Sequence, residues 1–172
     1  MAARKSGYST TALREWSGLI AERVERDELF RNASCVALYH ALPGEVQTAE
    51  LIERWADRKR ILLPLVAGND LRLLRYDGPR SLHVGAYGIL EPRPDGEEPP
   101  LEEIDLIIVP GVAFDRERNR MGRGKGFYDR LLSTLDAPRI GLCYDFQLVE
   151  QVPVEPFDKR MDRIITERES IG

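Results

Sequence analysis

The residues best suited to chemistry lie between positions 119 and 129, in the run Asn-Arg-Met-Gly-Arg-Gly-Lys-Gly-Phe-Tyr-Asp. Three glycines, Gly122, Gly124 and Gly126, alternate there with the cations Arg123 and Lys125. Glycine lets a backbone approach an anion closely and adopt positive φ angles without strain. A helix that begins directly after such a loop adds unpaired N–H groups and the positive end of its dipole. The run predicts a phosphate-binding loop, and the alternative is a mobile, solvated turn.

Two familiar phosphate motifs do not fit this run, but its charge favours an anion. Lys125 precedes Gly126 rather than Ser or Thr, which excludes a Walker A loop, and the glycine spacing is not that of the dinucleotide fingerprint. Residues 115–130 hold six cations and three acids, a local charge of +3 in a chain of net charge −4. A basic island in an acidic chain indicates a specific small anion rather than a nucleic-acid surface.

The whole chain has the composition expected of an ordinary soluble globular protein. Its 172 residues, 42% hydrophobic and 31% charged, predict a single domain over residues 1–172. No apolar run approaches a membrane span, and the first eight residues lack the apolar core expected of a secretory signal. Cys35 and Cys143 lie in strand-like runs, where buried inert thiols are expected. We expect a cytoplasmic monomer that binds neither nucleic acid nor membranes.

The elements that must position the loop alternate between helices and strands. Apolar periodicity predicts helices over 10–29, from an N-cap at Thr48 to Lys59, over 127–135 and near Gln147. Apolar runs predict strands over 34–39, 61–66, 71–76, 106–109, 139–144 and near Ile164, with a turn at Asn69-Asp70. This order predicts an α/β three-layer sandwich, with a mostly parallel central sheet and helices on both faces.

In such sheets ligands collect beyond the carboxyl ends of the strands. Pro110-Gly111 follows the continuous apolar run 106–109, so it falls in that zone just before the basic loop. The proline-rich and acidic segment 91–100 cannot form a central strand or a helix interior, and we expect it to be a surface connection within one domain.

Several stretches together resemble one known family. They are the run 105–115 that contains Pro110-Gly111, the run 119–129, Ala41-Leu-Pro-Gly-Glu-Val, Gly88-Ile-Leu-Glu-Pro, and Gln151-Val-Pro-Val with Asp158 and Met161-Asp162. From about residue 8 to 168 the chain resembles the 5-formyltetrahydrofolate cyclo-ligases, also called methenyltetrahydrofolate synthetases. The resemblance implies Mg²⁺-dependent, ATP-driven closure of 5-formyltetrahydrofolate to 5,10-methenyltetrahydrofolate, with release of ADP and phosphate through a phosphorylated formyl intermediate.

The resemblance also implies roles for individual residues. ATP is expected to bind along Arg120, Met121, Gly122, Arg123, Gly124, Lys125, Gly126, Phe127 and Tyr128, with Arg123, Lys125 and Tyr128 catalytic. The folate is expected to contact Glu45, His40, Tyr87 and Phe127, with the Glu45 carboxylate pairing with pterin N–H donors. Mg²⁺ is expected to be held by Asp129 and Asp162. Without the resemblance, Asp129 is equally well explained as an acid in the first turn of a helix. Asp162 would then be an ordinary turn acid, Glu45 a loop carboxylate and His40 a structural histidine.

One expected feature is missing ahead of the first strand. Family members usually carry a Lys-x-x-x-Arg pair on an N-terminal helix, and Arg4 and Lys5 fall too late to match it. The sequence predicts a truncated start, a substitution by Arg4 and Lys5, or weakened nucleotide binding. An alternative function is therefore a non-catalytic folate or nucleotide binder, and a nucleic-acid module is disfavoured because basic residues are confined to one loop.

Overall fold

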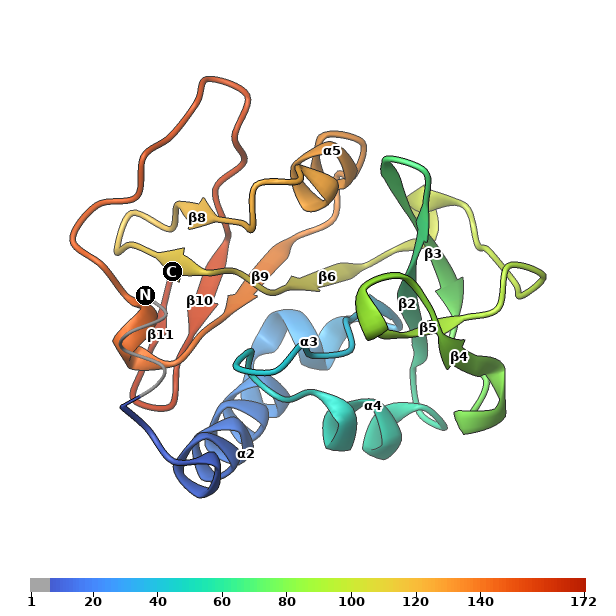
Figure 1. The fold of residues 1–172 in the computed structure, drawn as a ribbon, viewed down its shortest axis with the longest axis horizontal. Helices are drawn as coiled ribbons and strands as arrows, with labels where there is room; N and C mark the ends of the chain where they lie inside the picture. The colour runs from blue at the N-terminus through green and yellow to red at the C-terminus, as the bar shows by residue number, and fades with distance from the viewer. Residues whose placement is uncertain (1–6) are drawn as a thin grey trace.

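A seven-stranded sheet forms the centre of the fold, with the strand order β11–β10–β9–β6–β1–β2–β3 (Figure 1). The structure is a computed structural model that describes residues 7–172, so Arg4 and Lys5 lie outside the described residues. The strands are β1 (Cys35–Ala37), β2 (Arg60–Ala67), β3 (Asp70–Arg75), β6 (Leu106–Val109), β9 (Arg139–Leu142), β10 (Arg163–Ile165) and β11 (Ser170–Ile171). The middle five strands are parallel, whereas β3 and β11 run antiparallel at the two edges. The predicted mostly parallel sheet is confirmed.

Alternating side chains of the strands build a core on each face of the sheet. In β1, Val36 packs with α2 (Thr10–Arg26), α3 (Glu28–Asn32) and α4 (Ala49–Trp55), which cover one face. Cys35 and Ala37 point to the other face, which α5 (Phe127–Ser133) covers. All four residues of β6 are buried, as expected for a strand covered on both faces. The predicted three-layer sandwich is confirmed.

Two small hairpins lie outside the main sheet, and the sequence did not predict them. One pairs β4 (Leu82–Val84) with β5 (Leu90–Pro92), and the other pairs β7 (Ala113–Phe114) with β8 (Arg120–Met121). Four 3₁₀ turns complete the assignment of the described residues: η1 (Pro79–Ser81), η2 (Ala86–Gly88), η3 (Leu101–Glu103) and η4 (Asp145–Gln147). The segment expected to be only a surface connection thus begins inside a strand, and Glu91 in β5 is buried.

Several predicted boundaries were wrong for local reasons. The helix expected over 10–29 is interrupted at Asp27, which caps α3 by accepting a hydrogen bond from the Leu29 N–H. Thr48 occupies the N-cap position of α4, but its hydroxyl donates to the Tyr39 carbonyl instead of capping, and α4 ends at Trp55. In the β2–β3 hairpin the turn falls on Gly68-Asn69, because Gly68 has a φ of +64° and Asp70 already pairs with Ala67.

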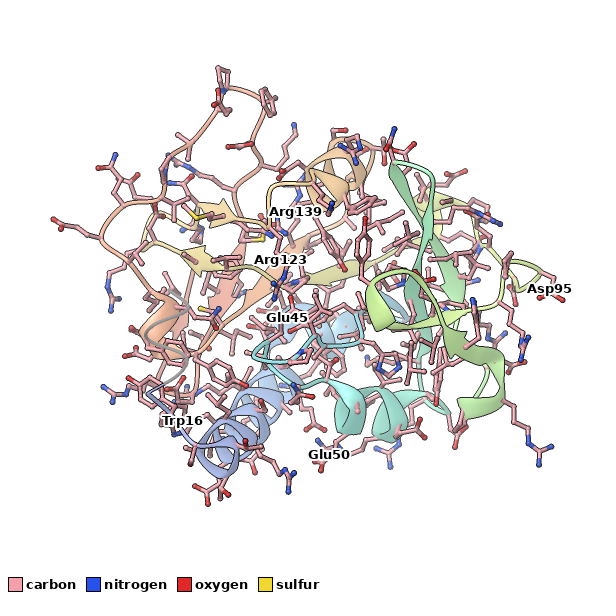
Figure 2. All side chains as sticks on the ribbon, viewed as in Figure 1. Trp16, Glu45, Glu50, Asp95, Arg123 and Arg139 are labelled. Carbon is pink, nitrogen blue, oxygen red and sulfur yellow. The ribbon has the colours of Figure 1, made fainter. Side chains whose placement is uncertain are left out.

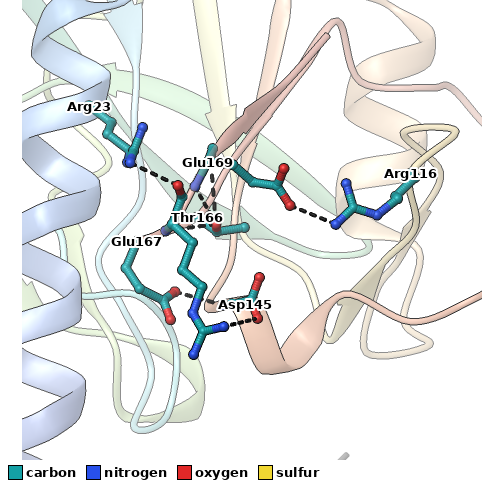
Figure 3. A network of polar contacts seen from close by, with 7 residues as sticks. Arg23, Arg116, Asp145, Thr166, Glu167 and Glu169 are labelled. Atoms are coloured by element: carbon teal, nitrogen blue, oxygen red, sulfur yellow. Dashed lines mark hydrogen bonds and ion pairs between the residues drawn. The ribbon is translucent and has the colours of Figure 1, made fainter.

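A polar network ties the last hairpin to the rest of the molecule (Figure 3). The buried Thr166 hydroxyl accepts hydrogen bonds from the N–H groups of Arg168 and Glu169, which closes the β10–β11 turn. Arg23 of α2 donates to the Arg168 carbonyl, and Arg116 pairs with the Glu169 carboxylate at 2.7 Å. The network fixes the edge strand β11 to the helix layer on one side and to the β7–β8 connection on the other.

Among residues 7–172, every helix is too short or too polar to cross a lipid bilayer.

Candidate active site

A cavity of about 310 Å³ opens beyond the carboxyl ends of β1 and β6. After β1 the chain builds β2 on one side of β1, and later adds β6 on the other side. Such a reversal leaves a crevice at the strand ends, where α/β proteins bind ligands. The segments that follow the two strands, Tyr39 to Leu42 and Pro110-Gly111, both contribute to the cavity wall. The position predicted for a ligand from Pro110-Gly111 therefore coincides with a real cavity.

Most of the predicted site residues line this cavity. They are His40, Glu45, Tyr87, Arg120, Gly122, Arg123, Lys125, Gly126, Phe127, Tyr128 and Asp129. Met121, Gly124 and Asp162 do not line it. Met121 and Gly124 nevertheless belong to the same loop, whereas Asp162 lies elsewhere in the fold.

The backbone conformation of the loop explains why glycines occur in it. Gly124 and Gly126 have φ angles of +93° and +73°, in the region that L side chains rarely adopt. Gly126 is also the N-cap of α5, so the loop passes directly into the helix. At Gly122 a side chain would press on the Arg120 guanidinium, since a Cβ atom there would lie 3.1 Å from both terminal nitrogens. The absence of a side chain at Gly122 thus lets the loop backbone lie close to the Arg120 guanidinium.

Arg120 is a buried cation at the base of the cavity. Its Nε donates to the Pro110 carbonyl at 2.7 Å, and its guanidinium lies 5.2 Å from the centre of the Tyr128 ring. A terminal nitrogen lies 3.5 Å from an Asp129 carboxylate oxygen. Burial lowers the pKa of Arg120, an effect that the charge of Asp129 opposes. An arginine keeps its proton under these conditions, so Arg120 supplies a fixed positive charge.

Glu45 and Arg123, both in the cavity lining, form an ion pair, and Figure 2 shows them close together. Their closest charged atoms, Arg123 Nε and Glu45 Oε2, are 3.8 Å apart. The Glu45 side chain is only 7% exposed, and its Oε1 accepts a hydrogen bond from the Leu42 N–H at 2.7 Å. The structure therefore brings the predicted folate-contacting glutamate against the predicted phosphate loop.

Two aromatic rings and one cation contact one another in the cavity lining. Tyr87 has a φ of 61°, an uncommon angle for a bulky residue, and its ring meets the Phe127 ring edge-on with centres 6.3 Å apart. The Lys125 ammonium lies 5.3 Å from the centre of the Tyr87 ring. Tyr87 thus meets Lys125 and Phe127 of the run 119–129, although it comes from a separate stretch of the sequence.

Two residues of the site stay neutral near pH 7. Burial, followed by the charge of Glu45, raises the pKa of Tyr128, so its hydroxyl remains protonated and acts as a donor rather than a base. Burial lowers the pKa of His40, although Glu53 acts against this shift. Within residues 7–172, the buried Nε2 atom of His40 has no hydrogen-bond partner. His40 therefore presents a neutral imidazole to the cavity.

The structure does not bring the two predicted Mg²⁺ carboxylates together. Asp129 lines the cavity, but Asp162 precedes β10, at the amino-end edge of the sheet. Its Oδ2 accepts a hydrogen bond from the N–H of Arg139, the first residue of the neighbouring strand β9, at 2.8 Å. Residues 7–172 contain no group of three or more His, Cys, Asp or Glu side chains placed to hold a metal. The prediction that Asp162 joins Asp129 at a metal therefore conflicts with the fold.

The apolar wall of the cavity and one of its carboxylates were not predicted from the sequence. Pro64, Val66 and Leu71 of the β2–β3 hairpin line the cavity, as does Glu91 of β5. The signal for the hairpin was the alternation in the runs 61–66 and 71–76, which predicted the strands but not what they face. Glu91 stands in the stretch Gly88-Ile-Leu-Glu-Pro, yet a proline-rich context made it look exposed.

Comparison with known proteins identifies the family of this chain. The model of the 5-formyltetrahydrofolate cyclo-ligase family matches residues 1–167. A 5-formyltetrahydrofolate cyclo-ligase of Escherichia coli K12 is 38% identical over 143 residues, which cover 78% of each chain. The corresponding protein of Haemophilus influenzae is 37% identical over 136 residues, 74% of this chain and 73% of the relative.

Solved structures agree with this result. The NMR structure of Aquifex aeolicus 5,10-methenyltetrahydrofolate synthetase matches with a TM-score of 0.89 and 37% identity, covering 98% of this chain and 87% of the other. A Mycoplasma pneumoniae synthetase, 22% identical, shares the fold with a TM-score of 0.74 over 96% of this chain and 93% of its own. The chain belongs to the 5-formyltetrahydrofolate cyclo-ligase family.

Proposed function

We propose that this chain catalyses the ATP-dependent cyclisation of 5-formyltetrahydrofolate to 5,10-methenyltetrahydrofolate in the cavity beyond β1 and β6. The observation that carries the proposal is the joining of two different walls in one cavity. One wall is the loop with Arg120, Arg123 and Lys125, and the other is the apolar hairpin with Pro64 and Leu71. The first suits the phosphates of ATP, and the second suits the flat, largely apolar face of a folate ring.

The chemistry explains why both substrates must meet. The oxygen of a formamide is a poor leaving group, so the formyl oxygen attacks the γ-phosphorus of ATP and ADP departs. N10 of the folate then attacks the activated formyl carbon, the ring closes, and the C–O bond breaks with loss of inorganic phosphate. Phosphoryl transfer asks a protein mainly for positioning and for neutralisation of charge.

The loop cations divide this work. Arg120 is held by the Pro110 carbonyl and is buried, so it offers a preorganised charge at the base of the cavity. Arg123 and Lys125 lie on the loop itself, with Arg123 against Glu45 and Lys125 above Tyr87. We assign them to the transferred phosphoryl group. The protonated Tyr128 hydroxyl adds a neutral donor.

Mg²⁺ would be held by Asp129 together with the ATP phosphates. Asp129 lines the cavity in the first turn of α5 with its side chain 40% exposed, and one carboxylate beside substrate phosphates is a usual arrangement for Mg²⁺. When bound, Mg²⁺ would neutralise phosphate charge.

An absorbance assay tests the proposal directly. The protein is incubated with 5-formyltetrahydrofolate, ATP and Mg²⁺, and the near-ultraviolet band of the methenyl product is followed. We expect product in proportion to enzyme and none without ATP. Folded protein that binds the folate but makes no product would favour the alternative, a non-catalytic binder, for which none of the three comparisons offers support. A cytoplasmic, monomeric enzyme remains our prediction.

A further inference from the structure

Glu91 is a buried carboxylate in the cavity wall that the roles above leave unused. It is 4% exposed, lines the cavity, and comes from β5, a strand outside the main sheet. A buried carboxylate is costly unless hydrogen bonds or a cation compensate for its lost hydration. Glu91 therefore needs hydrogen-bond donors or a cation to compensate for its position in a largely apolar wall.

The fold supplies one hydrogen bond, through a break in the main sheet. The Leu38 N–H donates to the Leu62 carbonyl, and the next bond of this parallel ladder would come from the N–H of residue 64. Pro64 has no N–H, so pairing between β1 and β2 stops there while β2 continues to Ala67. The Val66 N–H on the free edge donates to Glu91 Oε2 at 2.9 Å.

The second oxygen has a prepared place but no partner. Glu91 Oε1 lies against Gly85, where any side chain would collide with the carboxylate. Among residues 7–172, Oε1 accepts no hydrogen bond and forms no ion pair, and the bond from Val66 goes to the other oxygen. The other cavity glutamate differs, because Glu45 already contacts Arg123 and the Leu42 N–H.

We propose that Glu91 binds the N–H donors of the substrate's 2-amino-4-oxopyrimidine ring. This ring presents the N3–H and the 2-amino group side by side, and a carboxylate accepts such a pair through both oxygens. The neighbouring residues Pro64, Val66 and Leu71 would contact the face of the ring. Glu45, for which the resemblance implied this pairing, would then stand at the reacting end of the folate, beside Arg123. This inference rests on the proposed function.

The test is the Glu91→Gln variant. Glutamine keeps the volume and can still accept from the Val66 N–H, but it offers an NH₂ group where the pyrimidine also has donors. We expect the KM for 5-formyltetrahydrofolate to rise about 10- to 100-fold, with the KM for ATP and the melting temperature unchanged. Glu97→Gln is the matched control, since that side chain is 55% exposed and pairs with Arg75 away from the cavity.

A substrate analogue makes the test independent of any folding defect. With the wild-type protein, a 5-formyltetrahydrofolate lacking the 2-amino group should lose about tenfold or more in affinity by calorimetric titration. In Glu91→Gln the two folates should bind almost equally. Equal binding of both folates to the wild type, or an unchanged folate KM in a folded Glu91→Gln variant, would overturn the assignment. Wild-type protein without turnover would instead refute the proposed function.

Discussion

Lys125 is the loop residue whose contacts leave it most available to an anion. Within residues 7–172 it forms no ion pair with a carboxylate, and its ammonium lies above the Tyr87 ring. We expect Lys125→Ala to lower kcat by about 10²- to 10³-fold, because a charge aimed at the transferred phosphoryl group is lost. Its exposed position predicts an unchanged melting temperature. Lys125→Arg is the control that keeps the charge, and a near-normal kcat in Lys125→Ala would refute the role.

Asp129 and Asp162 offer a second contrast between single residues. We expect Asp129→Asn to raise the Mg²⁺ concentration for half-maximal activity about tenfold, because a ligand to the ion is lost. Asp162→Asn should leave that concentration unchanged and lower the melting temperature, because it weakens the bond to the Arg139 N–H. Titrations of activity with Mg²⁺ at saturating ATP measure both. Equal effects would show that Asp162 reaches the metal in the working enzyme.

For single residues, the sequence predicted site residues that are close together in the chain. It did not predict the surroundings of residues whose hydrogen-bond partners are far away in the chain. The loop 119–129 carries its glycines and cations within eleven positions, so its character was visible in the chain alone. Asp162 and Glu91 each bond to an N–H group more than twenty residues away. Whether such a carboxylate faces a cavity or a strand end depends on how distant strands pair in the sheet. A local sequence pattern does not contain that information.

The β7–β8 hairpin is the element that delivers Arg120 to the cavity, and Asp115 holds it in shape. The Asp115 carboxylate is buried and accepts four hydrogen bonds. Three come from Glu117 and Asn119 in the hairpin turn, and the fourth comes from the Val152 N–H in the segment beyond η4. One side chain thus fixes both the turn and the neighbouring loop.

Replacement of Asp115 should therefore act on stability and on ATP use together. We expect Asp115→Asn to cost about 2–4 kcal/mol in unfolding free energy, since an amide cannot accept all four bonds. The KM for ATP should rise because Arg120 is no longer held in place. Denaturant unfolding and steady-state kinetics measure the two effects. Arg118→Ala, in the same turn, provides a comparison that leaves the carboxylate intact.

The same carboxylate predicts a pH dependence of the element. Burial alone would raise the pKa of Asp115, but the hydrogen bonds from Val152 and Asn119 outweigh it and lower the pKa below the ordinary value. Its contribution to stability is then complete above about pH 4, the unfolded value, and is lost as the pH falls toward the folded value. The difference in melting temperature between wild type and Asp115→Asn should shrink below about pH 4. A difference that stays constant to pH 2.5 would contradict this account.

Among the elements, length decided what could be predicted. The buried strand β6 and the amphipathic helix α2 have enough residues for a period to show. The strands β7 and β8 have two residues each, and they exist because Phe114 anchors the hairpin in the core. The break at Asp27 was missed because the apolar period of α2 carries on into α3.

For the whole molecule, Phe114 joins the layers around the site. Its ring is fully buried and packs over two glycines, Gly111 after β6 and Gly141 in β9. A Cβ atom at Gly111 would lie 2.7 Å from the ring, and one at Gly141 would also collide with it. The close approach lets the hairpin and the sheet share one core.

We expect Gly141→Ala to destabilise the protein by about 1–3 kcal/mol, because the ring must move inside a packed core. The displaced hairpin should also raise the KM for ATP. Thermal unfolding and kinetics measure these effects. Gly18→Ala is the matched control, since a Cβ atom there meets no neighbour within 4 Å, and the helix should gain slightly in stability. Similar melting temperatures for the two variants would show that the contact is easily relieved.

The overall architecture was predictable because alternation of helices and buried strands leaves few arrangements open. The order of strands, and hence the crevice between β1 and β6, needed the structure, since β1 pairs with segments both early and late in the chain. The predicted single domain and monomeric state remain predictions.

The two thiols have a practical consequence. Cys35 and Cys143 are the only cysteines of the chain, both are buried, and burial raises the pKa of each. Native protein should therefore react slowly with maleimides, and an introduced surface cysteine would be labelled selectively. A fluorophore at Asn69→Cys would lie at the tip of the β2–β3 hairpin. The backbone carbonyl of residue 69 accepts a hydrogen bond from Arg130 of α5. The emission of the fluorophore would report, in real time, whether the two sides of the site part when product leaves.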